Sequence, residues 1–344
     1  MKRKAGQFLD GQTYDIFDIT KFIMSLAVVA IHTNLFPTIL YPWLRVAVPL
    51  FFVISSYLFF HKIDLQSPTD CKKTLAKFIK RNTTLYFSWF VIQLPLTLYV
   101  RQEWFTNGII SGLFNLIKNV FFGSTFFVSW FFSANLIAIV IIYFATKKIN
   151  SWILLIISVL CNLLCCIISG YNTEIPFVAS LNEYISPFFG NIANTFIVAL
   201  FWVVVGKMFA EKRVLISQKA SYIGLLISAV FLFLEWKITT VYLDSPIDRE
   251  CLFMLIPVVI FGFSVLLGHQ ATKNRYAKYL RNSSTLIYVT HYPLMIVAEK
   301  ALSIFNITTA LLIFLLTLCE TFVLCYTVIK LSNNTKFGFL KNLF

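Results

Sequence analysis

The sequence predicts an all-α membrane protein, a bundle of about ten transmembrane helices with both termini in the cytoplasm. Of its 344 residues, 58% are hydrophobic and only 13% are charged, which is more apolar surface than one water-soluble core can bury. The apolar residues form continuous runs of about 17 to 24 residues, long enough to cross about 30 Å of hydrocarbon as helices. Barrel strands would be shorter and would alternate in polarity.

The runs together form a single membrane domain over residues 1–344. They lie near 18–38, 43–60, 84–101, 125–145, 151–169, 192–210, 220–236, 251–268, 285–303 and 307–329.

The connections place these elements in order. The short turn FPTILYPW makes the first two runs antiparallel neighbours. A basic loop at 61–83 leads to the third run. The apolar, glycine-punctuated stretch GIISGLFNLIKNVFFGSTFF at 108–127 predicts an interfacial or re-entrant helix before the fourth. Among the later connections, only the one at 170–191 is expected to be a long loop.

The Lys and Arg residues indicate the orientation. Most of the 29 fall at the N-terminus, in alternate connections and at the C-terminus, which the positive-inside rule assigns to the cytoplasm. The net charge of +14 reflects this bias and attraction to anionic lipids, and it does not require nucleic acid. We therefore expect a multi-pass protein of the cytoplasmic membrane. The outer connections hold few basic residues: Arg101, Lys118, Lys237, Arg249 and Lys300.

Two further features bear on whether the chain has a signal peptide, disulfides or a metal site. The first run is too long for the apolar region of a cleavable signal peptide, and no small-residue cleavage site follows it. Every cysteine except Cys71 falls in a membrane run, so we expect neither a disulfide framework nor a metal site.

The first run carries two ionisable residues on one face. Lys21 and His32 are eleven positions apart, which is three helical turns plus about 20° and an axial distance of about 16 Å. Asp18 precedes Lys21 by one turn and can pair with it. His32 then lies beyond the bilayer midplane, where a histidine is expected to face an interior cavity. Arg45 begins the second helix at the same outer level.

Four motifs follow one another along the chain. They are Lys21 and His32 with ten intervening residues, RVAVPLFFVISSY at 45–57, SWFF at 129–132 and IYVTHYPL at 287–294. At these motifs the chain resembles the integral membrane acyltransferases of family 3, and the resemblance spans nearly the whole chain. Two positions depart from the family pattern. Ser56 stands where many members have glycine, and Lys21 replaces the more common arginine with a point charge.

The resemblance implies O-acyltransfer, usually acetyl, from cytoplasmic acyl-CoA to a hydroxyl of a cell-surface glycan or its lipid-linked precursor. Acetyl-CoA is then a co-substrate, and no permanently bound cofactor is expected. An alcohol needs a base to take its proton, a role suited to histidine at neutral pH. We interpret His32 as that base, or as a transient acyl carrier. Lys21 holds a CoA phosphate or fixes the helix with Asp18, and Arg45 binds the acceptor or stabilises the oxyanion.

Other residues are supporting candidates. Trp130 and Tyr57 bind substrate along a tunnel or pack in the core. His291 supports the site or forms a structural hydrogen bond. Glu320 lies in the middle of the last run, where a carboxyl group needs a proton or a partner that the sequence does not identify. The loops at 171–191 and 237–250 carry acidic and aromatic residues that could contact a sugar.

Two other functions remain open. A transporter or exporter of a glycan or other small polar substrate also places ionisable residues in its helices, although we find no internal repeat of the kind common in transporters. A ligand-sensing or resistance-related membrane module is the second. It is disfavoured because relatives of that kind carry a fused enzyme domain, which we do not expect in this sequence. An enzyme releases free CoA thiol when acceptor is present, whereas a transporter moves its substrate unchanged.

Overall fold

A computed structural model describes residues 15–35, 40–170, 176–242, 250–269 and 274–344. Within these ranges every regular element is helical, as the all-α prediction requires. In the first half these elements are α1 (Asp15–His32), α2 (Tyr41–Leu44), α3 (Ala47–Asp64), α4 (Pro68–Val100), η1 (Gln102–Phe105), α5 (Ile109–Phe122), α6 (Trp130–Ala145) and α7 (Ser151–Gly170). In the second half they are α8 (Pro176–Phe189), η2 (Ile192–Asn194), α9 (Phe196–Ala210), α10 (Gln218–Tyr242), α11 (Leu255–Gly268), α12 (Ala277–Ser303), α13 (Ala310–Ser332) and η3 (Thr335–Leu343).

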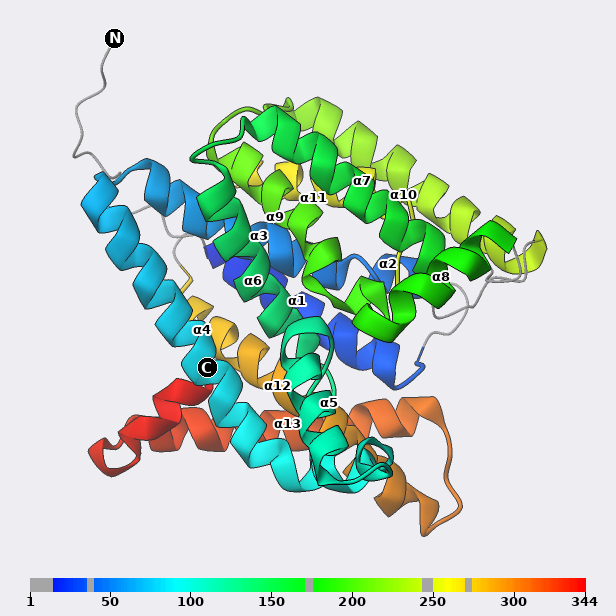
Figure 1. The fold of residues 1–344 in the computed structure, drawn as a ribbon. Coiled ribbons are helices and arrows are strands. Elements are labelled where there is room, and N and C mark those ends of the chain that lie inside the picture. Colours follow the sequence, from blue (N-terminus) through cyan, green and yellow to red (C-terminus); the bar gives the residue numbers. More distant parts are fainter. Residues whose placement is uncertain (1–14, 36–39, 171–175, 243–249, 270–273) are drawn as a thin grey trace.

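Helix α1 lies near the centre of the bundle, between two groups of helices (Figure 1). On one side it packs against α3, which packs against α9, and α9 contacts α6 and α7. On the other side it packs against α12, which is paired with α13. Helices α10 and α11 pair with each other and contact α2 and α3. Side chains along α1 therefore lie between the two groups.

Five helical segments are long and apolar enough to cross a membrane: Tyr41–Asp64, Pro68–Val100, Ser151–Gly170, Gln218–Tyr242 and Ala310–Ser332. The segments Pro176–Asn194 and Phe196–Ala210, bent by 42°, give a sixth if they form one span. The expected count of ten is not confirmed. Helices α6, α9 and α11 have 16, 15 and 14 residues, which is about 21 to 24 Å and shorter than the hydrocarbon layer.

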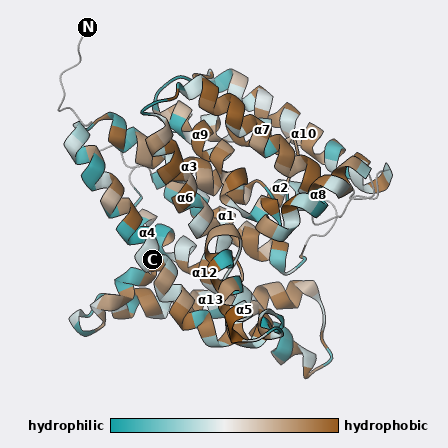
Figure 2. Ribbon diagram, viewed as in Figure 1, coloured by the Kyte–Doolittle hydropathy of each residue, from teal (hydrophilic) through white to brown (hydrophobic). Residues whose placement is uncertain are grey.

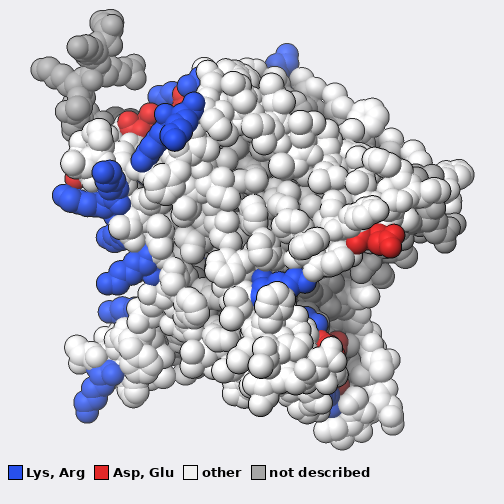
Figure 3. Space-filling model, in the orientation of Figure 1, with Lys and Arg blue, Asp and Glu red and all other residues white. Residues whose placement is uncertain are grey.

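The outer surface of the bundle is suited to lipid. Figure 2 shows that hydrophobic residues predominate along α7 and α10. Large apolar side chains on three helices point outward, among them Ile156, Leu160, Leu226, Val230, Leu311 and Val323. Figure 3 shows most basic side chains of the visible face along one edge, over and beside α4. This uneven distribution agrees with a membrane protein whose two surfaces differ in charge, and the orientation itself stays a prediction.

Helix α4 begins at Pro68 rather than near 84, so most of the expected basic loop at 61–83 is helical. Ser67 caps the helix because its hydroxyl accepts a hydrogen bond from the Asp70 N–H, 3.3 Å away. Pro68 suits the first helical position, where no N–H partner is lost. Lys and Arg are good helix formers. The clustering of Lys and Arg therefore predicts on which side of the membrane this segment lies, but it does not predict an irregular loop.

Helix α1 ends at His32 rather than near 38. Asn34 has a positive φ of 55°, its N–H bonds to the Ile31 carbonyl at 3.2 Å, and the Leu35 N–H bonds to the Ala30 carbonyl at 3.1 Å. This pair of hydrogen bonds is a Schellman cap. His32 consequently lies in the last turn of α1. Residues 36–38 of the expected helix lie outside the described residues.

Other boundaries differ by smaller amounts. The fourth run becomes helical only at Trp130 and the eighth only at Leu255, whereas the ninth already begins at Ala277. The helix expected at 108–127 is confirmed as α5. The expected loop at 170–191 contains α8, whose polar residues and internal proline interrupt its apolar pattern.

Helices α3 and α9 approach most closely at Ser56 and Gly206. A Cβ atom on Gly206 would lie 2.5 Å from the Val53 carbonyl oxygen and 3.0 Å from the Tyr57 nitrogen, both main-chain atoms. The small residue that permits this contact is thus on α9. The presence of serine rather than glycine at position 56 is compatible with close packing because the residue opposite it has no side chain.

Candidate functional site

His32 opens into a cavity of about 450 Å³ at the end of α1. The Schellman cap ends the helix beside it, so the imidazole is exposed to this space. Two aromatic side chains of α12 flank the ring, with centroid distances of 5.2 Å to His291 and 5.3 Å to Tyr292. The polar and aromatic lining of the cavity includes Arg101, Lys118, Trp130, Asn191, Glu250 and Tyr292.

His291 is fully buried beside His32. Its Nδ1 lies 3.0 Å from the carbonyl oxygen of Ile287. Because a carbonyl can only accept, Nδ1 carries the proton of the neutral ring and Nε2 is left as an acceptor. Nε2 has no hydrogen-bond partner among the described residues. A buried acceptor therefore lies next to the exposed imidazole of His32.

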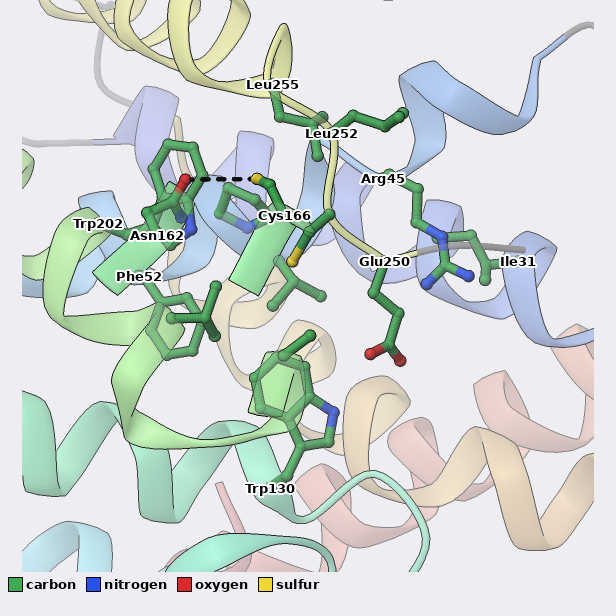
Figure 4. A pocket seen from close by; sticks show the side chains of 15 residues that line it. Ile31, Arg45, Phe52, Trp130, Asn162, Cys166, Trp202, Glu250, Leu252 and Leu255 are labelled. Carbon is green, nitrogen blue, oxygen red and sulfur yellow. Dashed lines mark hydrogen bonds between the residues drawn. The ribbon is translucent and has the colours of Figure 1, made fainter. Parts of the chain in front are cut away.

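Arg45 lines a smaller pocket of about 50 Å³. The guanidinium donates a hydrogen bond to the Tyr41 hydroxyl, and it lies within electrostatic range of the His32 ring. Figure 4 shows the Glu250 carboxylate extending between the Arg45 guanidinium and the Trp130 indole. Trp130 and Glu250 line both this pocket and the His32 cavity, so the two spaces adjoin.

Lys21 lines a different cavity of about 180 Å³, toward the start of α1. Among the described residues Lys21 forms no ion pair, because the Asp18 carboxylate instead contacts Arg281 of α12 at 3.7 Å. Arg81 of α4 lines the same cavity. Asn135 lines it too, and the Asn135 side-chain oxygen has no hydrogen-bond partner in the described part of the chain.

A second basic cavity of about 320 Å³ adjoins the Lys21 cavity. Arg81 and Leu85 line both. The other charged side chains around it are all lysines, two from α4 and one from the C-terminal η3 segment: Lys77, Lys80 and Lys341.

Three aromatic rings in the wall of the Lys21 cavity contact one another, and one of them also contacts the wall of the His32 cavity. Phe51, Phe131 and Tyr288 line the Lys21 cavity, and their centroids are 5.3 to 5.8 Å apart. The Tyr288 ring is 6.1 Å from that of His291. Its hydroxyl donates to the carbonyl of Val128 at 3.3 Å, and Val128 lines the His32 cavity. We call these three rings the aromatic partition.

The comparison with protein families agrees with the motifs. A family profile described as an acyltransferase domain, that of acyltransferase family 3, matches residues 14–330. The chain belongs to this family. The apolar helices and the family assignment together make it a membrane protein with an acyltransferase domain.

The curated relatives of this family-3 chain carry another name. Two matches are each called amino-acid racemase, from Enterococcus faecalis. One is 25% identical over 93% of this chain and 46% of its own length. The other is 28% identical over 40% of this chain and 19% of its own length. The chain thus spans less than half the length of these relatives, and no solved structure matches it.

The candidate site residues fall in four places. His32, Arg45, Trp130 and His291 lie together at the C-terminal end of α1, and Lys21 lies toward its start. Tyr57 packs among Phe17, His61 and Phe263 and lines none of the five cavities described. Glu320 lies in the middle of α13, also away from these cavities, and its Oε2 has no hydrogen-bond partner among the described residues.

Several lining residues were not singled out from the sequence. Glu250 and Asn191 end the two loops whose composition suited a sugar, and residues 171–175 and 243–249 of those loops lie outside the described residues. Two other lining residues could have been found from the sequence. Arg101 and Lys118 are basic residues in connections that the sequence predicts to be outer, where the positive-inside rule makes such residues rare.

Proposed function

We propose that this membrane acyltransferase moves an acyl group, usually acetyl, from cytoplasmic acyl-CoA to a hydroxyl of a cell-surface glycan or its lipid-linked precursor. The supporting observation is the arrangement around α1. Lys21 and His32 lie in separate cavities toward its two ends, and Tyr288 of the aromatic partition connects the walls of the two. Such an arrangement suits a donor and an acceptor that approach from opposite sides of the cytoplasmic membrane.

The two basic cavities suit the CoA donor. Its diphosphate and 3′-phosphate carry several negative charges, and Lys77, Lys80 and Lys341 supply cations; no acidic side chain is among the described residues of the lining. The pantetheine arm then occupies the Lys21 cavity. The unpartnered side-chain oxygen of Asn135 can accept a hydrogen bond from an amide N–H of that arm. This places the thioester toward the aromatic partition.

The outer cavity suits the acceptor and the chemical step. A ring nitrogen of His32 takes the proton of the acceptor hydroxyl, and the oxygen attacks the thioester carbonyl carbon. The new C–O bond forms, the C–S bond breaks, and the CoA thiolate receives the proton from His32. Arg45 stabilises the negative charge that develops on the carbonyl oxygen or orients the acceptor. Trp130 supplies an apolar face for a sugar ring.

The test is a comparison of purified wild type with His32→Ala in lipid nanodiscs. We measure acetyl-CoA binding, and free thiol release in the presence of a panel of glycans. His32→Ala is expected to lower thiol release by about 100-fold or more, because the general base is lost. Its affinity for acetyl-CoA stays unchanged, because His32 lies outside the donor cavities.

The matched control is His269→Ala. His269 is exposed and hydrogen-bonds the Tyr222 hydroxyl at 2.9 Å, away from both cavities, so wild-type turnover is expected. Wild-type turnover in folded His32→Ala would contradict the role of His32. Failure of folded wild type to bind acetyl-CoA would contradict the acyl-CoA donor.

Transport of a small polar solute is the second candidate function. It is favoured by the two cavities at opposite ends of α1, a geometry that transporters also use. The racemase name of the relatives makes an amino acid one solute to test. Uptake of labelled serine or alanine into proteoliposomes without acyl-CoA would favour transport, whereas thiol release without solute uptake would favour acyl transfer.

A further inference from the structure

The His32 cavity carries positive charge that its own acidic groups do not balance. Lys118 of α5 donates a hydrogen bond to the Pro187 carbonyl of α8 at 2.7 Å. This acceptor is neutral, and Lys118 forms no ion pair with any described acid. Its full charge therefore remains at the cavity wall, with further N–H groups free to donate.

Arg101 adds a second cation to the same wall. Its guanidinium lies over the Trp104 ring at 5.5 Å, and Trp104 also lines the cavity. Among the described residues Arg101 forms one ion pair, with Glu103 at 3.7 Å, and both side chains are well exposed. An exposed pair of this length contributes little and leaves Arg101 able to bind another anion.

Glu250 can offset only one of these two cations. Its carboxylate accepts a hydrogen bond from the Asn191 side chain at 2.8 Å. It also extends toward Arg45 in the adjoining pocket (Figure 4). Among the described residues this is the one acidic side chain in the lining, and it is already engaged by Asn191.

The position of the cations is unusual for a membrane protein. Outer connections contain few Lys and Arg residues under the positive-inside rule, yet two of those in this chain line one cavity. Figure 3 shows basic side chains at the middle of the visible face, at α5. Charges of one sign that line a concave space act more strongly on a ligand than they would on a flat surface.

We propose that the His32 cavity selects an anionic saccharide, with Lys118 and Arg101 binding a phosphate or carboxylate of the acceptor. This inference rests on the proposed acyl-transfer function and adds the charge of its acceptor. Trp104 and Trp130 pack on the sugar ring, and the side-chain amides of Asn115, Asn119 and Asn194 bond its hydroxyls. The anion at the α5 wall then orients a hydroxyl toward His32.

The test measures binding of three related sugars to the full chain in nanodiscs at low salt, without acyl-CoA. Glucose is the neutral probe, glucuronate carries a carboxylate and glucose 1-phosphate carries a phosphate. At least one charged sugar is expected to bind about tenfold or more tightly than glucose, with the difference shrinking as salt is added. The tighter of the two charged sugars identifies the preferred anion.

Substitutions test whether Arg101 and Lys118 cause the preference for charged sugars. The double variant Arg101→Gln with Lys118→Gln is expected to bind all three sugars equally, whereas Lys118→Arg keeps the preference. Lys300→Gln is the matched control, since Lys300 lies over the Tyr99 ring and not in the cavity lining. Equal wild-type affinities, no detectable binding of any sugar, or a preference that persists in the folded double variant would each overturn the proposal. The assay contains no CoA, so its failure is distinguishable from a failure of acyl transfer.

Discussion

His291 is the residue whose environment most specifically suggests a role beside His32. The hydrogen bond from Nδ1 to the Ile287 carbonyl fixes its tautomer, and Nε2 remains an acceptor next to the reacting region. We regard it as a positioning residue that orients the His32 ring, 5.2 Å away between centroids. Its hydrogen bond to the backbone one turn earlier also gives His291 a structural role. A test must therefore separate the positioning role from the structural role.

We expect His291→Ala to lower the maximal rate of thiol release by about tenfold to 100-fold, with little change in the KM for acetyl-CoA. His291→Gln is expected to retain most of the rate, because its amide can donate to Ile287 and still present an acceptor. The measurement is kcat and KM for each folded variant. Equal losses in both variants, or a loss confined to thermal stability, would indicate a structural role alone.

At the scale of elements, the contact between α3 and α9 depends on Gly206. A Cβ there would meet main-chain atoms of Val53 and Tyr57, which cannot move without shifting α3. We expect Gly206→Ala to lower the free energy of unfolding by about 1 to 3 kcal/mol, the usual cost of overpacking. Thermal unfolding in nanodiscs or detergent measures the effect.

Gly262→Ala in α11 is the control for that prediction. The nearest atom to a Cβ at Gly262 is a side-chain carbon of Leu225 at 3.7 Å, an ordinary contact. Alanine also has a higher helix propensity than glycine. Unchanged or slightly raised stability is therefore expected. Equal destabilisation by both substitutions would show that the α3 contact is not the cause.

The element scale also shows where sequence patterns have limits. Hydropathy located the apolar part of α4 but not its basic first half, because the same Lys and Arg residues that indicate an inner surface also form helices well. The end of α1 depends on Asn34 adopting a positive φ, which hydrophobic periodicity does not register.

At the scale of the whole molecule, we propose that the aromatic partition keeps the two cavities apart. We expect Phe131→Ala to raise acetyl-CoA hydrolysis in the absence of acceptor by several-fold, because water from the outer cavity then reaches the thioester. Free thiol release without glycan measures the leak. Phe78→Ala is the control, because Phe78 lines the Lys21 cavity but is not one of the three partition rings.

A leak of equal size in both folded variants would show that the partition has no special role. No leak in either would show that a single ring is not enough to separate the cavities.

By itself the sequence determined the helical class, the approximate location of the helices and the placement of Lys21 and His32 on one face of α1. These features depend on local periodicity and on the apolar composition, both of which can be read along the chain. Only the tertiary structure decided that His32 meets His291 of α12, that Glu250 lies beside Arg45, and that Tyr57 packs away from both cavities. Such contacts join residues far apart in the chain, and they depend on how the helices pack rather than on the pattern within any one helix.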